Sequence, residues 1–225
     1  MSARIVFITG TDTGVGKTLL TALLLARLRQ DRWHALAIKP FCTGGRDDVD
    51  LLQVLQDGEL TRDEINPFYF SQPLAPLVAG RNQGHQIRLE QVLEHIRRVA
   101  TRSQWLLVEG IGGVCVPLGR RYLVADLIKR LRCETIVVSS NRLGTLHSTL
   151  CACFLLKLRG VQKIKVVLMD QKNPDLSAKS NSHVLSEWLA AETISIPYLG
   201  PHANRRTSVI KNVKKIKKPL AKLFG

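Results

Sequence analysis

The feature that most constrains the fold is a glycine-rich loop, Gly10-Thr-Asp-Thr-Gly-Val-Gly-Lys-Thr18. It follows an apolar, strand-like segment, Ile5–Thr9, and it precedes Thr18–Gln30, in which apolar residues recur at helical spacing. Glycines let the backbone come close to a ligand, and the N–H groups of such a loop at a helix N-terminus attract phosphate oxygens. The pattern therefore predicts a strand, a phosphate-binding loop and a helix in succession.

The loop also indicates which ligand it binds. The backbone of Gly14, Val15 and Gly16 is expected to surround the phosphates of a nucleotide. Lys17 is expected to reach the β- and γ-phosphates, and the Thr18 hydroxyl to ligate Mg²⁺. We interpret the ligand as Mg-ATP.

Two further comparisons bear on the class of nucleotide-binding protein. The strict GxxxxGK[ST] pattern is missed by one residue, because Thr11 stands where its first glycine belongs. Thr11 and Asp12 occupy the positions at which partitioning-type ATPases carry a signature lysine. The stretch that begins at Val138 lacks the aspartate by which GTPases select guanine. The missing signature lysine and the missing guanine-selecting aspartate both favour an ATP-binding enzyme.

Strand-like and helical segments alternate along the chain, which predicts a doubly wound α/β fold with a mostly parallel sheet flanked by helices. We expect a single P-loop NTPase-like domain at residues 1–204, followed by a basic tail at 205–225. The expected strands are Ile5–Thr9, Ala35–Ile38, Trp105–Val108, Thr135–Val138 and Lys165–Leu168, and the expected helices are Thr18–Gln30, Leu89–Ala100, Val124–Leu131, Thr145–Arg159 and Ser182–Ala191.

Polar residues and glycines follow the second and third strands, at the sheet edge where ligands bind in such folds. Lys39 follows the second strand, and its charge could hold a carboxylate or a transferring phosphoryl group. Asp48 lies at the head of a helical segment, and Glu109 ends the third strand. Mg²⁺ prefers oxygen ligands of this kind. Gly112 and Gly113 would let a substrate lie against the backbone.

Taken together, GTDTGVGKT, KPFCTG, Asp48, EGIGG followed by VPL, and RLGT resemble the dethiobiotin synthetase family. The resemblance runs from Arg4 to about Gly200. It implies a homodimeric ligase that forms the ureido ring of dethiobiotin from 7,8-diaminopelargonate, CO₂ or bicarbonate, and Mg-ATP. The reaction would pass through a carbamate and a carbamic–phosphoric anhydride.

The resemblance also assigns residues to roles. Thr13, Lys17 and Lys39 would be catalytic, and Thr18, Asp48 and Glu109 would hold Mg²⁺ next to the nucleotide. Residues at the start of a later helix would meet the substrate's carboxylate across the dimer interface. The implied substrate-binding residues are Thr43, Gly112, Gly113, Leu143, Gly144 and Thr145.

The chain departs from the family pattern at several positions. His147-Ser148 stands where the family commonly has Asn-His, and Leu77 stands where a lid-like segment would have His. Met169 or Asp170 replaces an asparagine that helps to recognise adenine. The departures concern the nucleotide base and the substrate carboxylate, and they leave the phosphate and magnesium residues intact.

The net charge of +15 raises one alternative function. Eight Lys and Arg residues and no acid lie between Arg205 and Lys222. The alternative is a nucleotide-dependent switch that binds nucleic acid or a membrane through this tail. A solvated, partly helical or disordered tail is the favoured interpretation. The five cysteines form no CxxC pair, and no apolar segment is long enough to span a bilayer, so we expect a cytoplasmic protein.

Overall fold

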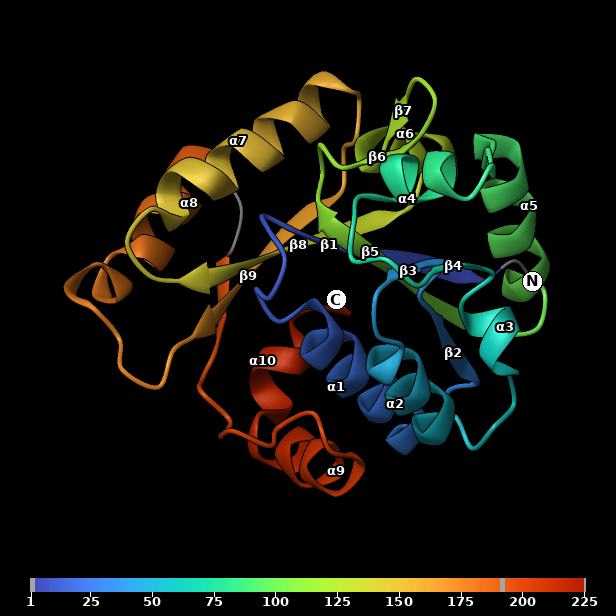
Figure 1. The fold of residues 1–225 in the computed structure, drawn as a ribbon. Helices are drawn as coiled ribbons and strands as arrows, with labels where there is room; N and C mark the ends of the chain where they lie inside the picture. The colour runs from blue at the N-terminus through green and yellow to red at the C-terminus, as the bar shows by residue number, and fades with distance from the viewer. Residues whose placement is uncertain (1–2, 191–192, 225) are drawn as a thin grey trace.

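The computed structural model describes residues 3–190 and 193–224, and its centre is a parallel sheet with helices on both faces (Figure 1). The sheet has six strands in the order β10-β9-β8-β1-β5-β2, and every neighbouring pair is parallel. The predicted fold class is therefore confirmed. The strands are β1 (Arg4–Gly10), β2 (Ala35–Ile38), β5 (Trp105–Gly113), β8 (Glu134–Asn141), β9 (Ile164–Asp170) and β10 (Thr193–Ile196).

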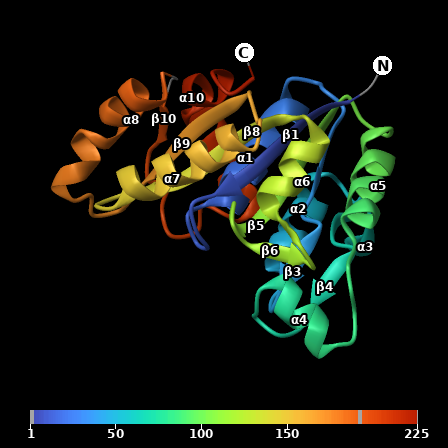
Figure 2. The same cartoon turned by 90° about the horizontal axis from the view of Figure 1, so that it is seen from above.

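The helices form two layers, one on each face of the sheet (Figures 1 and 2). The layer on one face comprises α1 (Lys17–Gln30), α2 (Asp47–Leu55), α9 (Arg206–Lys215) and α10 (Lys217–Ala221). The layer on the other face comprises α5 (Leu89–Ala100), α6 (Val124–Leu131), α7 (Thr145–Leu158) and α8 (Asn181–Leu189). The predicted end of the last helix, Ala191, lies outside the described residues.

Short elements fill the connections after β2, β5 and β9. They include two small two-stranded sheets. One is the parallel pair β3-β4, in which β3 contacts β5, and the other is the antiparallel pair β6-β7, which follows β5 in the chain. The elements are β3 (Phe41–Thr43), α3 (Arg62–Ile65), β4 (Phe68–Phe70), α4 (Pro76–Asn82), β6 (Pro117–Gly119), β7 (Tyr122–Leu123) and a 3₁₀ turn, η1 (Leu176–Lys179). Most of them are too short to show a helical or strand period in the sequence.

Strand β5 is longer than the predicted Trp105–Val108, and this corrects the expectation that Glu109 stands at the end of the strand. Pairing with β1 continues to Gly113, with an irregularity between the pairs Ile8–Glu109 and Gly10–Gly113. Glycines permit this close approach, since a Cβ on Gly113 would lie 3.0 Å from the Thr11 carbonyl oxygen. Glu109 therefore lies within the strand and not at its end.

Helix α1 is buried on nearly all sides because α9 and α2 cover the surface that faces away from the sheet. Leu20, Leu23, Leu24 and Leu25 are all fully buried. This double coverage explains why the helix is rich in leucine around its whole circumference. It also fixes the helix whose N-terminus carries the phosphate loop.

The basic C-terminal segment packs through one face. Val209, Val213 and Leu220 are fully buried, and α9 and α10 both contact α1. The lysines of this segment lie on the exposed side. The segment expected to be a solvated, partly helical or disordered tail is helical over α9 and α10, and it packs on the fold with a basic outer surface.

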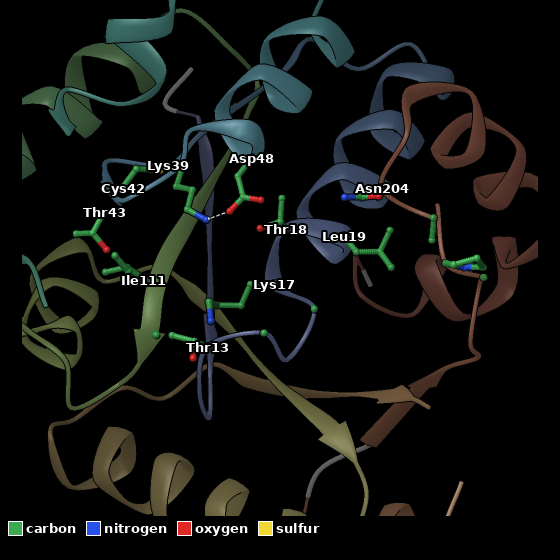
Figure 3. Close-up of a pocket in the computed structure, with 17 residues that line it drawn as sticks. Thr13, Lys17, Thr18, Leu19, Lys39, Cys42, Thr43, Asp48, Ile111 and Asn204 are labelled. Atoms are coloured by element: carbon green, nitrogen blue, oxygen red, sulfur yellow. Dashed lines mark hydrogen bonds and ion pairs between the residues drawn. The ribbon is translucent and has the colours of Figure 1, made fainter. Parts of the chain in front are cut away.

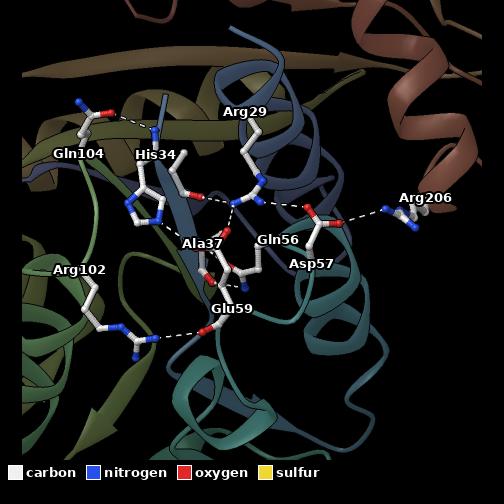
Figure 4. Close-up of polar contacts among 10 residues, drawn as sticks. Arg29, His34, Ala37, Gln56, Asp57, Glu59, Arg102, Gln104 and Arg206 are labelled. Carbon is white, nitrogen blue, oxygen red and sulfur yellow. Dashed lines mark hydrogen bonds and ion pairs between the residues drawn. The ribbon is translucent and has the colours of Figure 1, made fainter. Parts of the chain in front are cut away.

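Polar contacts secure the sheet edge near this segment (Figure 4). Asp57 pairs with Arg29 of α1 at 3.0 Å and with Arg206 of α9 at 3.2 Å. The buried Gln56 amide accepts a hydrogen bond from the Ala37 N–H and donates one to the Ala37 carbonyl. Because β2 is an edge strand, this side chain satisfies backbone groups that would otherwise be open to pairing.

No helix within residues 3–190 and 193–224 is long and apolar enough to cross a membrane.

Candidate active site

The phosphate loop connects β1 to α1 as predicted. Gly14 and Gly16 have φ values of +69° and +101°, a region that residues with a Cβ rarely adopt. A Cβ on Gly16 would also lie 3.0 Å from Met169 Cγ. The Thr11 N–H donates to the Val138 carbonyl at 2.9 Å, which attaches the loop to β8. The glycines thus allow the conformation of the loop, and a backbone hydrogen bond attaches the loop to β8.

Lys17 begins α1 with its side chain buried, and its ammonium donates to the Asp12 carbonyl at 2.6 Å. The pKa of Lys17 is lowered to about 8, mainly by burial, with Glu109 acting to raise it and the charge of Lys39 acting to lower it. An incoming polyphosphate would favour the charged form. Binding of an anion beside Lys17 would therefore stabilise the charged form of this side chain.

Four side chains from different elements meet beside Lys17. The Lys39 ammonium donates to Glu109 Oε1 at 2.7 Å and also pairs with the Asp48 carboxylate. The Thr18 hydroxyl donates to the same Glu109 oxygen at 2.6 Å. Burial opposes the charge of Lys39, but Glu109 and Asp48 outweigh it and raise its pKa above the ordinary value. Lys39 is therefore a fixed cation.

The same cluster offers oxygen ligands that fit a magnesium ion. Glu109 is 1% exposed, and its Oε2 is buried with no hydrogen-bond partner in the described part of the chain. A buried carboxylate oxygen without a partner is costly, which points to a ligand that completes the site. Thr18, Asp48 and Glu109 together supply a hydroxyl and two carboxylates, a donor set suited to Mg²⁺ that keeps water and phosphate ligands.

A cavity of about 510 Å³ opens above this cluster (Figure 3). Figure 3 shows Thr43 and Ile111 on one side of Lys17 and Asn204 on the other. The sequence-predicted residues that line the cavity are Thr13, Gly14, Gly16, Lys17, Thr18, Lys39, Thr43, Asp48 and Gly112. Most of the predicted phosphate and metal residues thus line one cavity, together with two of the six predicted substrate-binding residues, Thr43 and Gly112.

Three other predicted residues support the cavity from behind and do not line it. Glu109 lies beneath Lys39 and Thr18, and Val15 is 5% exposed. Gly113 packs on the backbone of the phosphate loop. The contacts of these residues position the phosphate loop and the Lys39 ammonium. A direct contact between these residues and a ligand stays a prediction.

The predicted residues at the start of α7 lie apart from the cavity lining within this chain. Leu143 is 82% exposed, and Gly144 caps the helix with a φ of +91°. Thr145 is buried and shares a 2.6 Å hydrogen bond with Ser139, which in turn accepts one from Thr11. Thr145 therefore connects α7 to the phosphate loop. A role in substrate binding across a dimer interface stays a prediction.

The departures at β9 and α4 also have definite positions. Met169 is buried beneath Gly16. Asp170 accepts a 2.8 Å hydrogen bond from Asn141, so it belongs to a polar network between β8 and β9. Leu77 lines a second cavity and not the one above Lys39.

Sequence reasoning missed part of the lining. Gly200, Pro201, Ala203 and Asn204 form one wall, which follows the unpredicted strand β10. The Gly-Pro pair was an available signal, because such pairs mark turns and ligand-binding loops follow strands in this fold. The other residues missed are Leu19, Cys42, Gly45 and Ile111. Burial raises the pKa of Cys42 to about 12, so this thiol stays protonated beside Lys39.

The parallel sheet carries a glycine-rich loop before α1, and that loop ends in the buried Lys17 and the partly buried Thr18, with acids on neighbouring elements. This combination defines a P-loop nucleotide-binding protein. Solved structures share this fold. A ParA family ATPase from Chlorobium tepidum matches 98% of this chain and 95% of its own with a TM-score of 0.62 at 16% identity. The cell division protein MinD from Aquifex aeolicus matches 96% and 97% with a TM-score of 0.57 at 16% identity.

Sequence comparison gives the family. A model described as an AAA domain matches residues 4–211. The ATP-dependent dethiobiotin synthetase of Bacillus licheniformis is 36% identical over 200 residues, covering 86% of this chain and 83% of the relative. The enzyme of the same name from Methanocaldococcus jannaschii is 35% identical over 167 residues, covering 72% and 78%. The chain belongs to the dethiobiotin synthetase family.

Proposed function

We propose that this chain is an ATP-dependent dethiobiotin synthetase, which closes the ureido ring of dethiobiotin from 7,8-diaminopelargonate, CO₂ and Mg-ATP. The observation that carries the proposal is that Lys17, Lys39 and Thr18 line one cavity, while the buried Glu109 beneath it accepts hydrogen bonds from Lys39 and Thr18. Relatives named for this activity match most of the chain. We expect it to act in the cytoplasm, where its free cysteines would stay reduced.

The cavity suggests how the nucleotide lies. Its phosphates would rest on the loop from Gly14 to Gly16, with Lys17 on the β- and γ-phosphates. The base would extend along Leu19 toward Asn204, whose amide carries both a donor and an acceptor. This arrangement leaves Thr43, Ile111 and the opposite end for the second substrate.

Thr18, Asp48 and Glu109 are the residues that would hold Mg²⁺. The ion would supply positive charge to the phosphate oxygens, whose negative charge otherwise repels a nucleophile. Glu109 Oε2, which lacks a partner, supports this assignment.

Ring closure needs two displacements that this cavity can organise. The carbamate oxygen attacks the γ-phosphorus and ADP leaves, which yields a carbamic–phosphoric anhydride. The second amine then attacks the carbamoyl carbon, loses a proton, and expels inorganic phosphate. Lys17 and Lys39 would stabilise the oxygen charges in both steps, because fixed cations in a water-poor site act strongly on developing charge. Thr13, Thr43 and the Gly112 backbone would orient the carbamate.

The role of Lys39 can be separated from nucleotide binding. In Lys39→Ala, turnover should fall by two orders of magnitude or more, while nucleotide affinity changes little, since this charge acts mainly in the transition state. Stopped-flow binding of a fluorescent ATP analogue and steady-state phosphate release measure the two quantities. An equal loss in both would place Lys39 in nucleotide binding and remove the catalytic role.

The role of Glu109 predicts a change in the magnesium requirement. Glu109→Gln keeps the size of the side chain but removes its charge. Half-maximal activity should then need at least ten-fold more Mg²⁺. A magnesium titration that overlays the wild-type curve would exclude Glu109 from the metal site.

An exposed apolar stripe on α7 and the turn before it supports assembly into a homodimer. Leu143, Phe154 and Leu158 are 82%, 46% and 85% exposed, and Leu176 nearby is 86% exposed. Large exposed apolar patches are typical of interfaces. A second copy that covers this stripe would bring the start of α7, with Leu143, Gly144 and Thr145, toward a neighbouring cavity.

The deciding experiment measures phosphate release from Mg-ATP with and without diaminopelargonate and bicarbonate, followed by mass spectrometry of the product. Release that requires both substrates, with formation of the cyclic urea, would establish the function. Tight nucleotide binding with no diamine-dependent release would refute the synthetase and leave a P-loop protein of another activity.

A further inference from the structure

A second cavity of about 390 Å³ lies between α4 and the turn that follows β6. It shares no lining residue with the cavity above Lys39. The proposed ring closure makes no use of it. The lining residues are Pro76, Leu77, Arg81, Gly84, His85, Gln86, Ile87, Leu118, Gly119 and Arg120.

The lining combines apolar residues with two arginines. Pro76 and Leu118 are buried, while Arg81 and Arg120 are exposed. Arg81 comes from α4 and Arg120 from the turn after β6, so the two arginines border the cavity from different elements. Within residues 3–190 and 193–224, neither side chain has a hydrogen bond or an ion pair. The lining contains no acid, and His85 adds a further nitrogen donor.

The walls of the cavity are held in place by close backbone contacts. The His85 N–H donates to the Gly80 carbonyl at 2.8 Å, which folds the chain back over the end of α4. The buried Tyr122 hydroxyl donates to the Ile87 carbonyl at 3.2 Å. A Cβ on Gly119 would lie only 2.5 Å from that same carbonyl oxygen, so the approach of these segments depends on glycine. Such a preformed hollow is typical of ligand sites.

We propose that this cavity binds an organic carboxylate that carries an apolar chain. The guanidinium groups of Arg81 and Arg120 match a carboxylate in charge and in planar geometry. The apolar lining residues Leu77, Ile87 and Leu118 would contact a hydrocarbon chain, which a bare inorganic anion lacks. The absence of acids from the lining disfavours a cationic ligand. The bound anion would join Arg81 of α4 to Arg120 beside β6.

Such a ligand would act on an element that also touches the active site. Helix α4 contacts both β6 and β3. Strand β3 carries Cys42 and Thr43, which line the cavity above Lys39. The carboxylate would therefore restrain α4 next to the wall of the substrate end.

Isothermal titration calorimetry of the full chain with nonanoate tests the proposal. The variant Arg81→Gln/Arg120→Gln should weaken nonanoate binding at least ten-fold, because both charge-assisted contacts are lost. The matched control is Arg88→Gln/Arg121→Gln, which removes the same charge from neighbouring arginines outside the lining, and it should leave the affinity within two-fold. Equal weakening in both variants would show a general charge effect and overturn the site.

Two further titrations test the chemical class of ligand. Affinity should rise several-fold for each methylene from heptanoate to nonanoate, and inorganic phosphate should bind at least ten-fold more weakly than nonanoate. Phosphate that binds as well as nonanoate, or an affinity independent of chain length, would refute an amphipathic carboxylate site. Absence of saturable nonanoate binding would refute it as well. None of these results depends on turnover, so the ring-closing function can fail or hold independently.

Discussion

Removal of the Lys39 charge should destabilise the free protein before any question of catalysis arises. Glu109 is 1% exposed, and within the described residues its charged contact is the 2.7 Å pair with Lys39. In Lys39→Met the side chain keeps its approximate length, but Glu109 is left as an unpaired buried charge. Breaking a buried pair in this way costs about 3–5 kcal/mol. Asp48 contributes less, because its side chain is 42% exposed and water screens it.

This cost is large enough to measure without ambiguity. For a chain of this size, each kcal/mol shifts the melting temperature by about 2–4 °C, so the expected fall is about 6–20 °C. Urea denaturation near pH 7 without nucleotide, followed by circular dichroism, would give the free energy directly. The exposed Lys129→Met is the matched control, and surface changes of this kind stay within about 0.5 kcal/mol.

The double variant Lys39→Met/Glu109→Gln isolates the cause. If the cost comes from the unpaired charge of Glu109, neutralising that charge should restore most of the stability lost in the single variant. A double variant as unstable as Lys39→Met would refute the electrostatic explanation and indicate lost packing instead. A loss below about 1 kcal/mol in Lys39→Met would show that solvent reaches the cluster.

Three other predictions follow from the site and from α7. Burial lowers the pKa of Lys17 to about 8, so nucleotide binding should take up close to one proton at about pH 9 and almost none at pH 7. Calorimetry in two buffers of different ionisation heat measures this uptake, and Lys17→Arg should abolish it. Gly16→Ala should weaken nucleotide binding more than 100-fold, because a Cβ there meets a methionine, while Gly14→Ala, with open space, should lose about ten-fold from backbone strain alone. Phe154→Asp and Leu158→Asp should each give a monomer by light scattering with helix content unchanged, and a persistent dimer would move the interface away from α7.

Local patterns carried most of the fold prediction. The strand before the phosphate loop and the helix after it have clear periods, and both were placed within a residue of their observed ends. The rule that ligands bind at the carboxyl ends of parallel strands brought Lys39, Asp48 and Thr18 together from distant positions. The structure confirms that these three side chains and Glu109 form one cluster.

The remaining features depend on tertiary contacts that leave little trace in the sequence. Strand β10 has four residues, Thr193–Ile196, too few to establish a period, so the wall from Gly200 to Asn204 was not predicted. The burial of α9 against α1 was also missed, because a lysine-rich segment resembles a solvated one unless its apolar residues are assigned a partner. The extension of strand β5 to Gly113 was not predicted either. It depends on the neighbouring backbone, which can approach Gly113 closely only because that residue has no Cβ.

The charges of the active-site cluster explain why these residues depend on one another. Two lysines, Lys17 and Lys39, face two carboxylates, Asp48 and Glu109, so the formal charges cancel in the free protein. Cancellation is what lets charged groups stay buried without a ligand, since an unpaired charge there would be strongly destabilising. A substitution of any one member therefore changes folding as well as chemistry. Turnover of such variants must be divided by the folded fraction measured under the same conditions, because only the loss that remains reports on the transition state.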